Sequence, residues 1–332
     1  MKNHKKYGNF FTLKILFFLL FIASFAEIIA NDKPLLVKYR HHYFLPIFSP
    51  VPDSQFFEND LGLKTEADFH DPEIIAQIVN SGGFIIFPPI VFSENKINFF
   101  LDSGALSKPN KINILGADDR GRDVLSRIIY GLRNSLYFAM ILSFVAIFLA
   151  VAIGAVQGYF GGITDIILQR FTEIWSSLPL IMILLLFSTI FSLGYFGFLI
   201  LMTLFSWMGF ANLVRAEFLR LRNSGFVMAS KIIGLNSFTI IIRHLIPNLK
   251  PMIAANFPFM ISASIVSLAS LDFLGIGFIE ENASLGELLN QGKNNINSPW
   301  LAFSSVAIVS IITSLLVFTA EDLRNYFKAN RR

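Results

Sequence analysis

Hydrophobic residues are concentrated in six stretches, each about as long as a membrane-spanning helix, and polar residues fill the segments between them. A spanning helix needs roughly 20 mostly apolar residues, because in lipid every backbone polar group must be satisfied within the segment. The stretches cover approximately residues 10–30, 134–158, 166–193, 196–214, 252–279 and 300–320. The pattern therefore predicts an all-α membrane protein with about six transmembrane helices.

The composition agrees with this pattern and narrows the chemistry. The 332 residues are 54% hydrophobic and only 15% charged, with 37 Phe and no Cys. This apolar fraction exceeds ordinary globular usage, and without Cys there is no disulfide, thiol nucleophile or Cys-based metal site. The sequence also has no G-x-x-x-x-G-K-[ST] phosphate loop, G-x-S-x-G elbow or H-E-x-x-H zinc pair. We therefore expect no catalytic residue, cofactor, metal or nucleic-acid partner, and no enzymatic activity in the chain itself.

The distribution of Lys and Arg predicts which side of the membrane each segment faces. Basic residues precede the first span, dominate the loop 215–250 and recur in the tail, whereas the short loop after the fifth span is acidic. Cytoplasmic loops carry an excess of Lys and Arg, so both termini and the loop 215–250 are expected in the cytoplasm. This divides the chain into an N-terminus with the first helix (1–30), a periplasmic segment (31–133), a five-helix core (134–320) and a cytoplasmic tail (321–332).

The first apolar stretch has a second interpretation, a cleaved signal peptide, because it follows a basic start. The residues just before Asn31 do not form an A-x-A cleavage site. Cleavage would also leave five spans and spoil the consistent charge pattern. We therefore favour a membrane anchor.

The segment 31–111 has a mixed composition and no repeat. A helix-like stretch lies near residues 72–80, and Gly82-Gly83 and Pro88-Pro89 mark turns. Two interpretations stay open for this mixed periplasmic segment. It is either a solvated loop or a small cap that meets a delivery protein.

Small residues and prolines mark special positions within the spans. Gly154 and Gly158 stand four residues apart, a spacing that lets helix backbones approach closely, although turn glycines at a helix end give the same pattern. Pro179 and Pro258 interrupt the third and fifth spans, and each removes a backbone hydrogen bond. Kinked helices of this kind either line a path or are simply structural.

Ionisable groups within the spans are few. Arg170 and Glu173 stand three residues apart, share a helix face and are expected to pair. Asp272 is the only ionisable residue of the fifth span, and we favour an interfacial place for it over an ion or proton site. No chain of buried acids and histidines appears, which argues against a proton-driven carrier.

The loop 215–250 is both basic and amphipathic. Apolar residues recur in it at helical spacing, namely Phe226, Ala229, Ile233, Phe238, Ile241 and Ile242. Gly234 separates two runs, Asn236 or Ser237 can cap the second, and Pro247 is expected to end it. We predict two short helices joined at a glycine. Such a loop either rests on lipid headgroups or docks a soluble partner, and the glycine elbow favours the partner.

This loop resembles the cytoplasmic E-A-A-x-x-x-G-x9-I-x-L-P loop, the EAA loop, of permease subunits in binding-protein-dependent ABC importers, which seats in the ATPase subunit. Met228-Ala229-Ser230 occupy the first three positions, Gly234 follows at the right distance, and Ile246-Pro247 fill the last two. The glutamate is absent, and His244 stands where the pattern has isoleucine. The resemblance implies an ATPase-coupling site made of Phe226, Ala229, Ser230, Ile233, Gly234, His244 and Pro247.

Further segments, over about residues 115–326, resemble oligopeptide and dipeptide permeases. They include LGADDRGRD (115–123), GYFGG (158–162), LDFLGIG (271–277) and SPWL (298–301), with Asp272 replacing a serine. The long outside segment and SLGELL (284–289) look most like the microcin C/oligopeptide-type permease with an extended periplasmic loop.

The resemblance implies an ABC importer type I permease fold in a multi-pass protein of the bacterial inner membrane. The implied partners are a second permease subunit, two ATP-binding cassette ATPase subunits, a periplasmic solute-binding protein, a peptide-like substrate and membrane lipid. ATPase closure would then be coupled to alternating access. The alternative function is a non-transporting membrane scaffold that recruits a cytoplasmic enzyme through the same loop.

Overall fold

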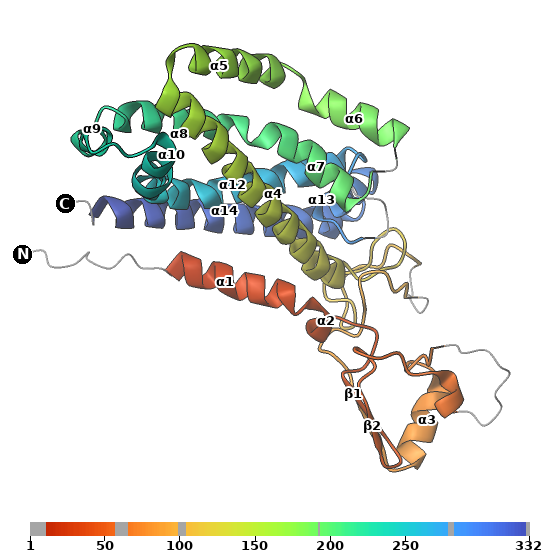
Figure 1. The fold of residues 1–332 in the computed structure, drawn as a ribbon. Helices are drawn as coiled ribbons and strands as arrows, with labels where there is room; N and C mark the ends of the chain where they lie inside the picture. The colour runs from red at the N-terminus through yellow and green to blue at the C-terminus, as the bar shows by residue number, and fades with distance from the viewer. Residues whose placement is uncertain (1–10, 57–65, 99–103, 192, 278–281, 330–332) are drawn as a thin grey trace, which may run out of the picture. The chain divides into compact units, whose positions relative to one another are not determined.

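A computed structural model describes residues 11–56, 66–98, 104–191, 193–277 and 282–329 (Figure 1). The chain divides into two compact units. We call residues 134–280, with 1–18 and 305–332, the helical unit. Residues 19–133, with 281–304, form the mixed unit.

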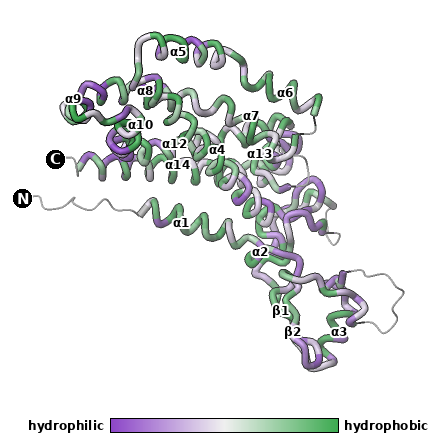
Figure 2. Tube along the Cα trace, in the orientation of Figure 1, coloured by the Kyte–Doolittle hydropathy of each residue, from purple (hydrophilic) through white to green (hydrophobic). Residues whose placement is uncertain are grey.

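The helical unit is built from helices joined by short turns. The helices α1 (Phe11–Ser24), α4 (Val124–Phe160) and α14 (Pro299–Ala329) run from one unit into the other, whereas α12 (Lys250–Phe273) lies wholly within this unit. Between α4 and α12 follow α5 (Gly162–Ser176), α6 (Leu180–Ile190), α7 (Tyr195–Ser206), α8 (Met208–Leu221), α9 (Gly225–Ile232), α10 (Ser237–Thr239), the π-helix η2 (Ile240–Leu245) and α11 (Ile246–Asn248). Hydrophobic residues prevail along most of these helices (Figure 2).

Among the described residues, four helical stretches are long and apolar enough to cross a membrane, namely Val124–Phe160, Tyr195–Leu221, Lys250–Phe273 and Pro299–Ala329. The pair α5–α6 makes a fifth if its two halves, bent by 63°, count as one broken span. The break expected at Pro179 is confirmed, because Pro179 is the N-cap of α6, where its missing N–H interrupts no helical bond. The first predicted span contains only a shorter apolar helix within α1, followed by α2 (Ala26–Ile29), and residue 10 lies outside the described part.

The two glycines of α4 mark a close approach between helices. A Cβ atom on Gly154 would lie 2.6 Å from the carbonyl oxygen of Ala211, and one on Gly158 would lie 2.4 Å from Cβ of Phe218. Both neighbours belong to α8, so the side-chain-free backbone of α4 is what permits this packing. The helix-packing interpretation of the glycine pair is therefore confirmed.

The remaining special positions of the spans are also placed. Arg170 Nη1 lies 2.6 Å from Glu173 Oε2, an exposed ion pair on α5, as the spacing predicted. Pro258 is buried inside α12, which continues through it as one helix. Asp272 lies buried near the end of the same helix, with its carboxylate against the backbone of Gly277.

The mixed unit contains a three-stranded antiparallel sheet in the order β2–β1–β3. Its strands are β1 (Leu36–Tyr39), β2 (His42–Phe44) and β3 (Phe84–Ile86), and Val37 pairs with Phe44 on one side and Ile85 on the other. The unit also includes the 3-10 helix η1 (Asp53–Gln55), α3 (Pro72–Asn80) and α13 (Leu285–Asn294).

Helix α3 covers the stretch predicted to be helical. The side chain of Asp71 caps it by accepting a hydrogen bond from the amide of Glu73, 2.8 Å away, and Pro72 occupies the first turn. Ile74 and Ile78, one helical turn apart, are buried with Val37 of the sheet. The segment that was predicted to be periplasmic therefore has an apolar core of its own.

Candidate functional site

The loop between α8 and α12 holds all the residues of the predicted coupling site. Its first helix, α9, ends in a hydrogen-bonded turn around Gly234, in which the Gly234 amide donates to the carbonyl of Lys231 and the Leu235 amide donates to that of Ser230. This is the Schellman arrangement, which requires a left-handed residue after the helix. Gly234 has φ +87°, and nothing lies within 4 Å of where its Cβ would be. The glycine elbow is therefore imposed by the backbone conformation and not by crowding.

The second helical piece begins at Asn236. Its side chain accepts a hydrogen bond of 2.8 Å from the amide of Thr239, so Asn236, one of the two expected capping residues, is the N-cap. After α10 the chain widens into η2, where the Ile246 amide donates to the carbonyl of Ile241, five residues back. Wide turns of this kind are rare in helices and occur frequently at functional sites.

Pro247 does not end the second piece, contrary to the sequence prediction. It lies within α11, which extends to Asn248, and α12 begins at Lys250 after a single turn residue. A proline within a helix lacks an N–H and clashes with the carbonyl four residues back. Pro247 lies in the first turn of α11, where the N–H that proline lacks would have no partner within α11 in any case. The helical path can therefore continue.

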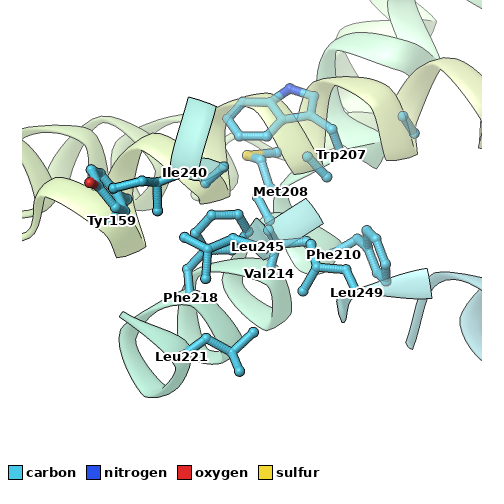
Figure 3. Packing of buried hydrophobic residues seen from close by; sticks show 14 of the residues in the cluster. Tyr159, Trp207, Met208, Phe210, Val214, Phe218, Leu221, Ile240, Leu245 and Leu249 are labelled. Carbon is cyan, nitrogen blue, oxygen red and sulfur yellow. The ribbon is translucent and has the colours of Figure 1, made fainter. Parts of the chain in front are cut away.

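The loop is anchored by buried apolar side chains. Val227 of α9, Ile240 and Leu245 of η2, and Leu249 are all fully buried. They share a cluster with residues of α4 and α8, among them Tyr159, Trp207, Met208, Phe210, Val214, Phe218 and Leu221 (Figure 3). Lys231 adds a cation–π contact, with its Nζ 5.5 Å from the ring centroid of Tyr159. Both helical pieces therefore rest on the ends of α4 and α8.

Polar contacts tie α8, on which the loop rests, to α5. Arg215 of α8 donates two hydrogen bonds to the carboxylate of Asp165 on α5, at 2.5 and 2.7 Å. This paired geometry fixes orientation as well as distance. The guanidinium of Arg222 lies against Gly161, where a Cβ would come within 2.1 Å of its Nη1. The loop's base is thus continuous with α4, α5 and α8.

The opposite face of the loop consists of apolar residues exposed to solvent. Ile233 is 78% exposed, and Phe226 and Ala229 are also exposed, as expected of a docking face. Sequence reasoning did not place Met228, Ile232 or Phe238 in the site, although Ile232 is 86% and Phe238 is 70% exposed. Several large apolar side chains exposed together on one protein surface are typical of an interaction site.

Three predicted site residues lie elsewhere. Ser230 is buried, and its hydroxyl donates to the carbonyl of Phe226, 2.8 Å away, so it supports α9 from within. His244 is half-buried, and its carbonyl accepts a hydrogen bond of 2.6 Å from the Asn248 side chain. Pro247 is exposed at the far end of the loop.

A second polar cluster lies in the mixed unit and joins two segments quoted above for their family likeness. Arg122 Nε donates to Asp118 Oδ2 at 2.8 Å, and its Nη2 lies 3.1 Å from Glu287 Oε1. Arg127, which is fully buried, pairs with Glu287 as well, and Gln291 Nε2 donates to the same carboxylate at 3.2 Å. Buried charges are tolerated only when they are paired in this way. The cluster therefore fastens α13 to the start of α4.

The electrostatics of this cluster follow from its burial. Burial by itself would lower the pKa of Arg122, but the attraction and hydrogen bonds of Asp118 and Glu287 outweigh it and raise that pKa. Burial raises the pKa of the neighbouring Asp123 carboxyl, although it accepts hydrogen bonds from Asn113 and Ser126 at 2.8 Å each. In the part of the chain that the structure describes, no three His, Cys, Asp or Glu side chains gather to hold a metal ion.

Comparison with known proteins gives a consistent result. A family model described as "Binding-protein-dependent transport system inner membrane component" matches residues 146–328. Over 98% of its length the chain is 40% identical to the "Peptidoglycan transport system permease protein YejE" of Agrobacterium fabrum, covering 90% of that protein. It is 38% identical over 99% of its length to the "Inner membrane ABC transporter permease protein YejE" of Escherichia coli, covering 95% of it. The predicted family resemblance is thereby confirmed.

Two further comparisons each match a little less than two thirds of the chain. The chain is 30% identical over 64% of its length to the "Oligopeptide transport system permease protein OppC" of Lactococcus lactis, covering 74% of it. A solved structure of the MetNI methionine ABC transporter in an inward-facing conformation matches 60% of this chain and 96% of its own, with a TM-score of 0.52 and 16% identity. At that identity the match shows the fold alone, the type I importer permease fold. The matches to the YejE proteins span nearly the whole chain and therefore extend over the mixed segment as well.

Proposed function

Because this chain belongs to the family of binding-protein-dependent transport system inner membrane components, we propose that it is the membrane-spanning permease subunit of an ATP-driven importer for peptides or peptide-like compounds. The substrate class is supported by the names of its relatives, which concern peptidoglycan and oligopeptide transport. The sequence has no phosphate-binding loop, so two separate ATPase subunits would supply the energy. A second permease subunit and a periplasmic solute-binding protein would complete the complex.

The observation that carries this proposal is the two-faced loop between α8 and α12. Its inner face is locked into the cluster around Val214 and Phe218, and its outer face presents exposed apolar residues such as Ile232 and Ile233. An exposed apolar face on an anchored base is suited to a groove in a soluble partner. In this arrangement the loop and both termini lie in the cytoplasm, where the ATPase subunits would be.

The anchoring suggests how closure of the ATPase dimer would reach the spans. A force applied to α9 passes to α4 and α8 through buried side chains, and to α5 through the Asp165–Arg215 pair. Packed interiors transmit displacement because they are dense and have few voids. The loop would therefore move as one body with these helices, and access would alternate between the two sides of the membrane.

The test replaces Gly234 in the assembled complex. Gly234→Val places a β-branched side chain at φ +87°, a conformation that such residues rarely adopt, whereas Gly234→Asn introduces a residue that tolerates it. No atom lies within 4 Å of the new Cβ, so the pair separates backbone conformation from steric clash. We expect the Val variant to lose uptake and substrate-stimulated ATPase activity and the Asn variant to keep most of both. Normal uptake and ATPase activity in the Val variant would contradict the coupling role.

A non-transporting scaffold is the outcome that the same preparation can reveal. Vesicles containing the complex would be supplied with labelled peptide on the outside and ATP at the ATPase subunits. Accumulation that requires ATP supports the permease. Retention of the ATPase subunits without accumulation of any peptide in a broad mixture would favour the scaffold.

A further inference from the structure

A pocket of about 520 Å³ lies in the helical unit, where α8 and α14 end and α12 begins. Residues from all three helices line it, among them Leu213, Glu217, Arg220, Phe259, Arg324 and Lys328. Asn248 of α11 also lines it, but none of the described lining residues comes from α9, α10 or η2. The pocket is therefore separate from the exposed apolar face proposed to meet the ATPase.

The charges of the pocket leave a positive excess. Among the described lining residues Glu217 is the one carboxylate, and it pairs with Arg220, whose Nε donates to it at 3.0 Å. Arg324 and Lys328 stand four residues apart on α14 and thus on one helix face. Within the described residues no ion pair includes either of them. An anionic group entering the pocket would meet two cations that no carboxylate of the described chain contacts at ion-pair distance.

The lining also changes from charged to apolar along α8. On α8, Arg220 lies at the end and Leu213 seven residues earlier. On α12 the lining is uncharged throughout, from Pro251 at the start of the helix to Phe259 eight residues later. With a rise of 1.5 Å per residue, the charged and apolar ends stand roughly 10 Å apart. Leu213 and Phe259 are both exposed, so the apolar end is open to an occupant.

We propose that this pocket binds an anionic phospholipid, with its phosphate at Arg324 and Lys328 and the start of an acyl chain along Leu213 and Phe259. Basic pockets between the ends of spanning helices suit phosphate headgroups. A free phosphate ion would use only the charged end and would leave the apolar end unfilled. The lipid matches both ends, and in a membrane it is already present at this level of the helices.

The test measures binding of a fluorescent phosphatidylglycerol, labelled on its acyl tail, to the full-length chain in mild detergent. The double variant Arg324→Gln/Lys328→Gln is expected to bind about 25-fold more weakly, about fivefold for each cation removed. The control Lys108→Gln/Arg243→Gln loses the same charge from exposed positions outside the pocket and should bind as the original chain does. Lys328→Arg keeps the charge and should also retain binding. Each variant is first shown to elute as a single folded species.

Three results would overturn the proposal. The first is unchanged affinity in the double variant, or an equal loss in the control. The second is equally tight binding of labelled phosphatidylcholine, which would show that the charges do not select the headgroup. The third is displacement of the labelled lipid by excess inorganic phosphate, which would assign the pocket to the free ion. Weaker lipid binding in Phe259→Gln would support the acyl-chain contact, and unchanged binding there would contradict it.

Discussion

Two regions of this chain hold helix ends in place, and they do so with opposite chemistry. The loop between α8 and α12 rests on buried apolar side chains such as Leu245 and Phe218. The start of α4 is instead tied to α13 by ion pairs that centre on Arg127 and Glu287. Apolar contacts are non-directional, whereas paired ions require a fixed geometry and lose most when one partner is removed. The ionic region should therefore be the less tolerant of the two, and the apolar one should respond mainly to lost volume.

The largest effect is expected in the ionic region. Arg127→Met removes a fully buried cation and leaves the carboxylates of Asp118 and Glu287 with one partner fewer. The loss of stability should be about 3–5 kcal/mol, seen as a much lower melting temperature of the purified chain in detergent. Arg170→Met, which breaks the exposed pair with Glu173, should cost at most about 1 kcal/mol. Equal melting temperatures for the two variants would contradict the expectation that the buried ion pair stabilises the fold more than the exposed one.

The next effect tests the apolar anchor. Leu245→Ala empties a fully buried place in η2 and should cost about 3 kcal/mol, because the surrounding cluster relaxes only in part. Ile242→Ala changes the same helix at a position 45% exposed and should stay within about 0.5 kcal/mol. Thermal melting in the same detergent compares them. If Ile242 proved the costlier of the two, the assignment of inner and outer faces would be wrong.

A smaller effect concerns the outer face alone. Ile233→Glu adds a charge to the proposed docking surface and should weaken retention of the ATPase subunits about tenfold without changing the melting temperature. Ile112→Glu makes the same exchange at an exposed isoleucine of the mixed unit and should leave retention unchanged. Copurification from membranes at matched expression provides the measurement. A parallel loss in both variants would point to a general effect of the charge.

The smallest effect is the contribution that two carboxyls beside the ionic cluster make to the pH dependence of stability. Burial raises the pKa of both Asp119 and Asp123 above the ordinary value of 3.8 in the folded chain. At a pH between the ordinary and the raised pKa, the folded state therefore binds more protons than the unfolded state. The contribution of these two carboxyls to stability should therefore increase as pH falls from neutrality. It is lost as pH rises through their raised pKa values. Asp123→Asn should flatten this dependence in part, since Asp119 still titrates. Melting temperatures between pH 7 and pH 4.5 would show it, and an unchanged slope in the variant would exclude Asp123 as a source.

Local features of the coupling loop could be predicted from sequence. Gly234 and Asn236 act through their own backbone and nearest neighbours. The break at Gly234 was predicted, and Asn236 was one of the two residues expected to cap the second helix. Which apolar residues face outward could be predicted only in part. Ile233 was expected on the exposed face, but Leu245 and Ile232 are chemically alike, and only tertiary packing buries the first and exposes the second. Periodicity shows that a helix has two faces, but it does not show which one meets the rest of the chain.

The ionic cluster lay beyond sequence reasoning for a different reason. Arg127 and Glu287 are separated by 160 residues, and no local rule pairs them. Glu287 was noted only as part of a segment that resembles peptide permeases, and Arg127 was not singled out. The buried hydroxyl of Ser230 was likewise counted with the docking residues, although it bonds within its own helix. For the ionic cluster the missing information was spatial proximity, whereas the hydrogen bond from Ser230 to Phe226 is local to α9.

The wide turn of η2 has one consequence for any comparison of this loop among relatives. A π turn contains about one residue more than an α turn, so it shifts the phase between chain position and helix face by one residue. Between Gly234 and Pro247, residues at the same spacing from the glycine therefore point in the same direction only in relatives that have the same wide turn. In a relative with a regular helix there, the residue at an equal count would point to a different side, and its homologue in space would stand one position away.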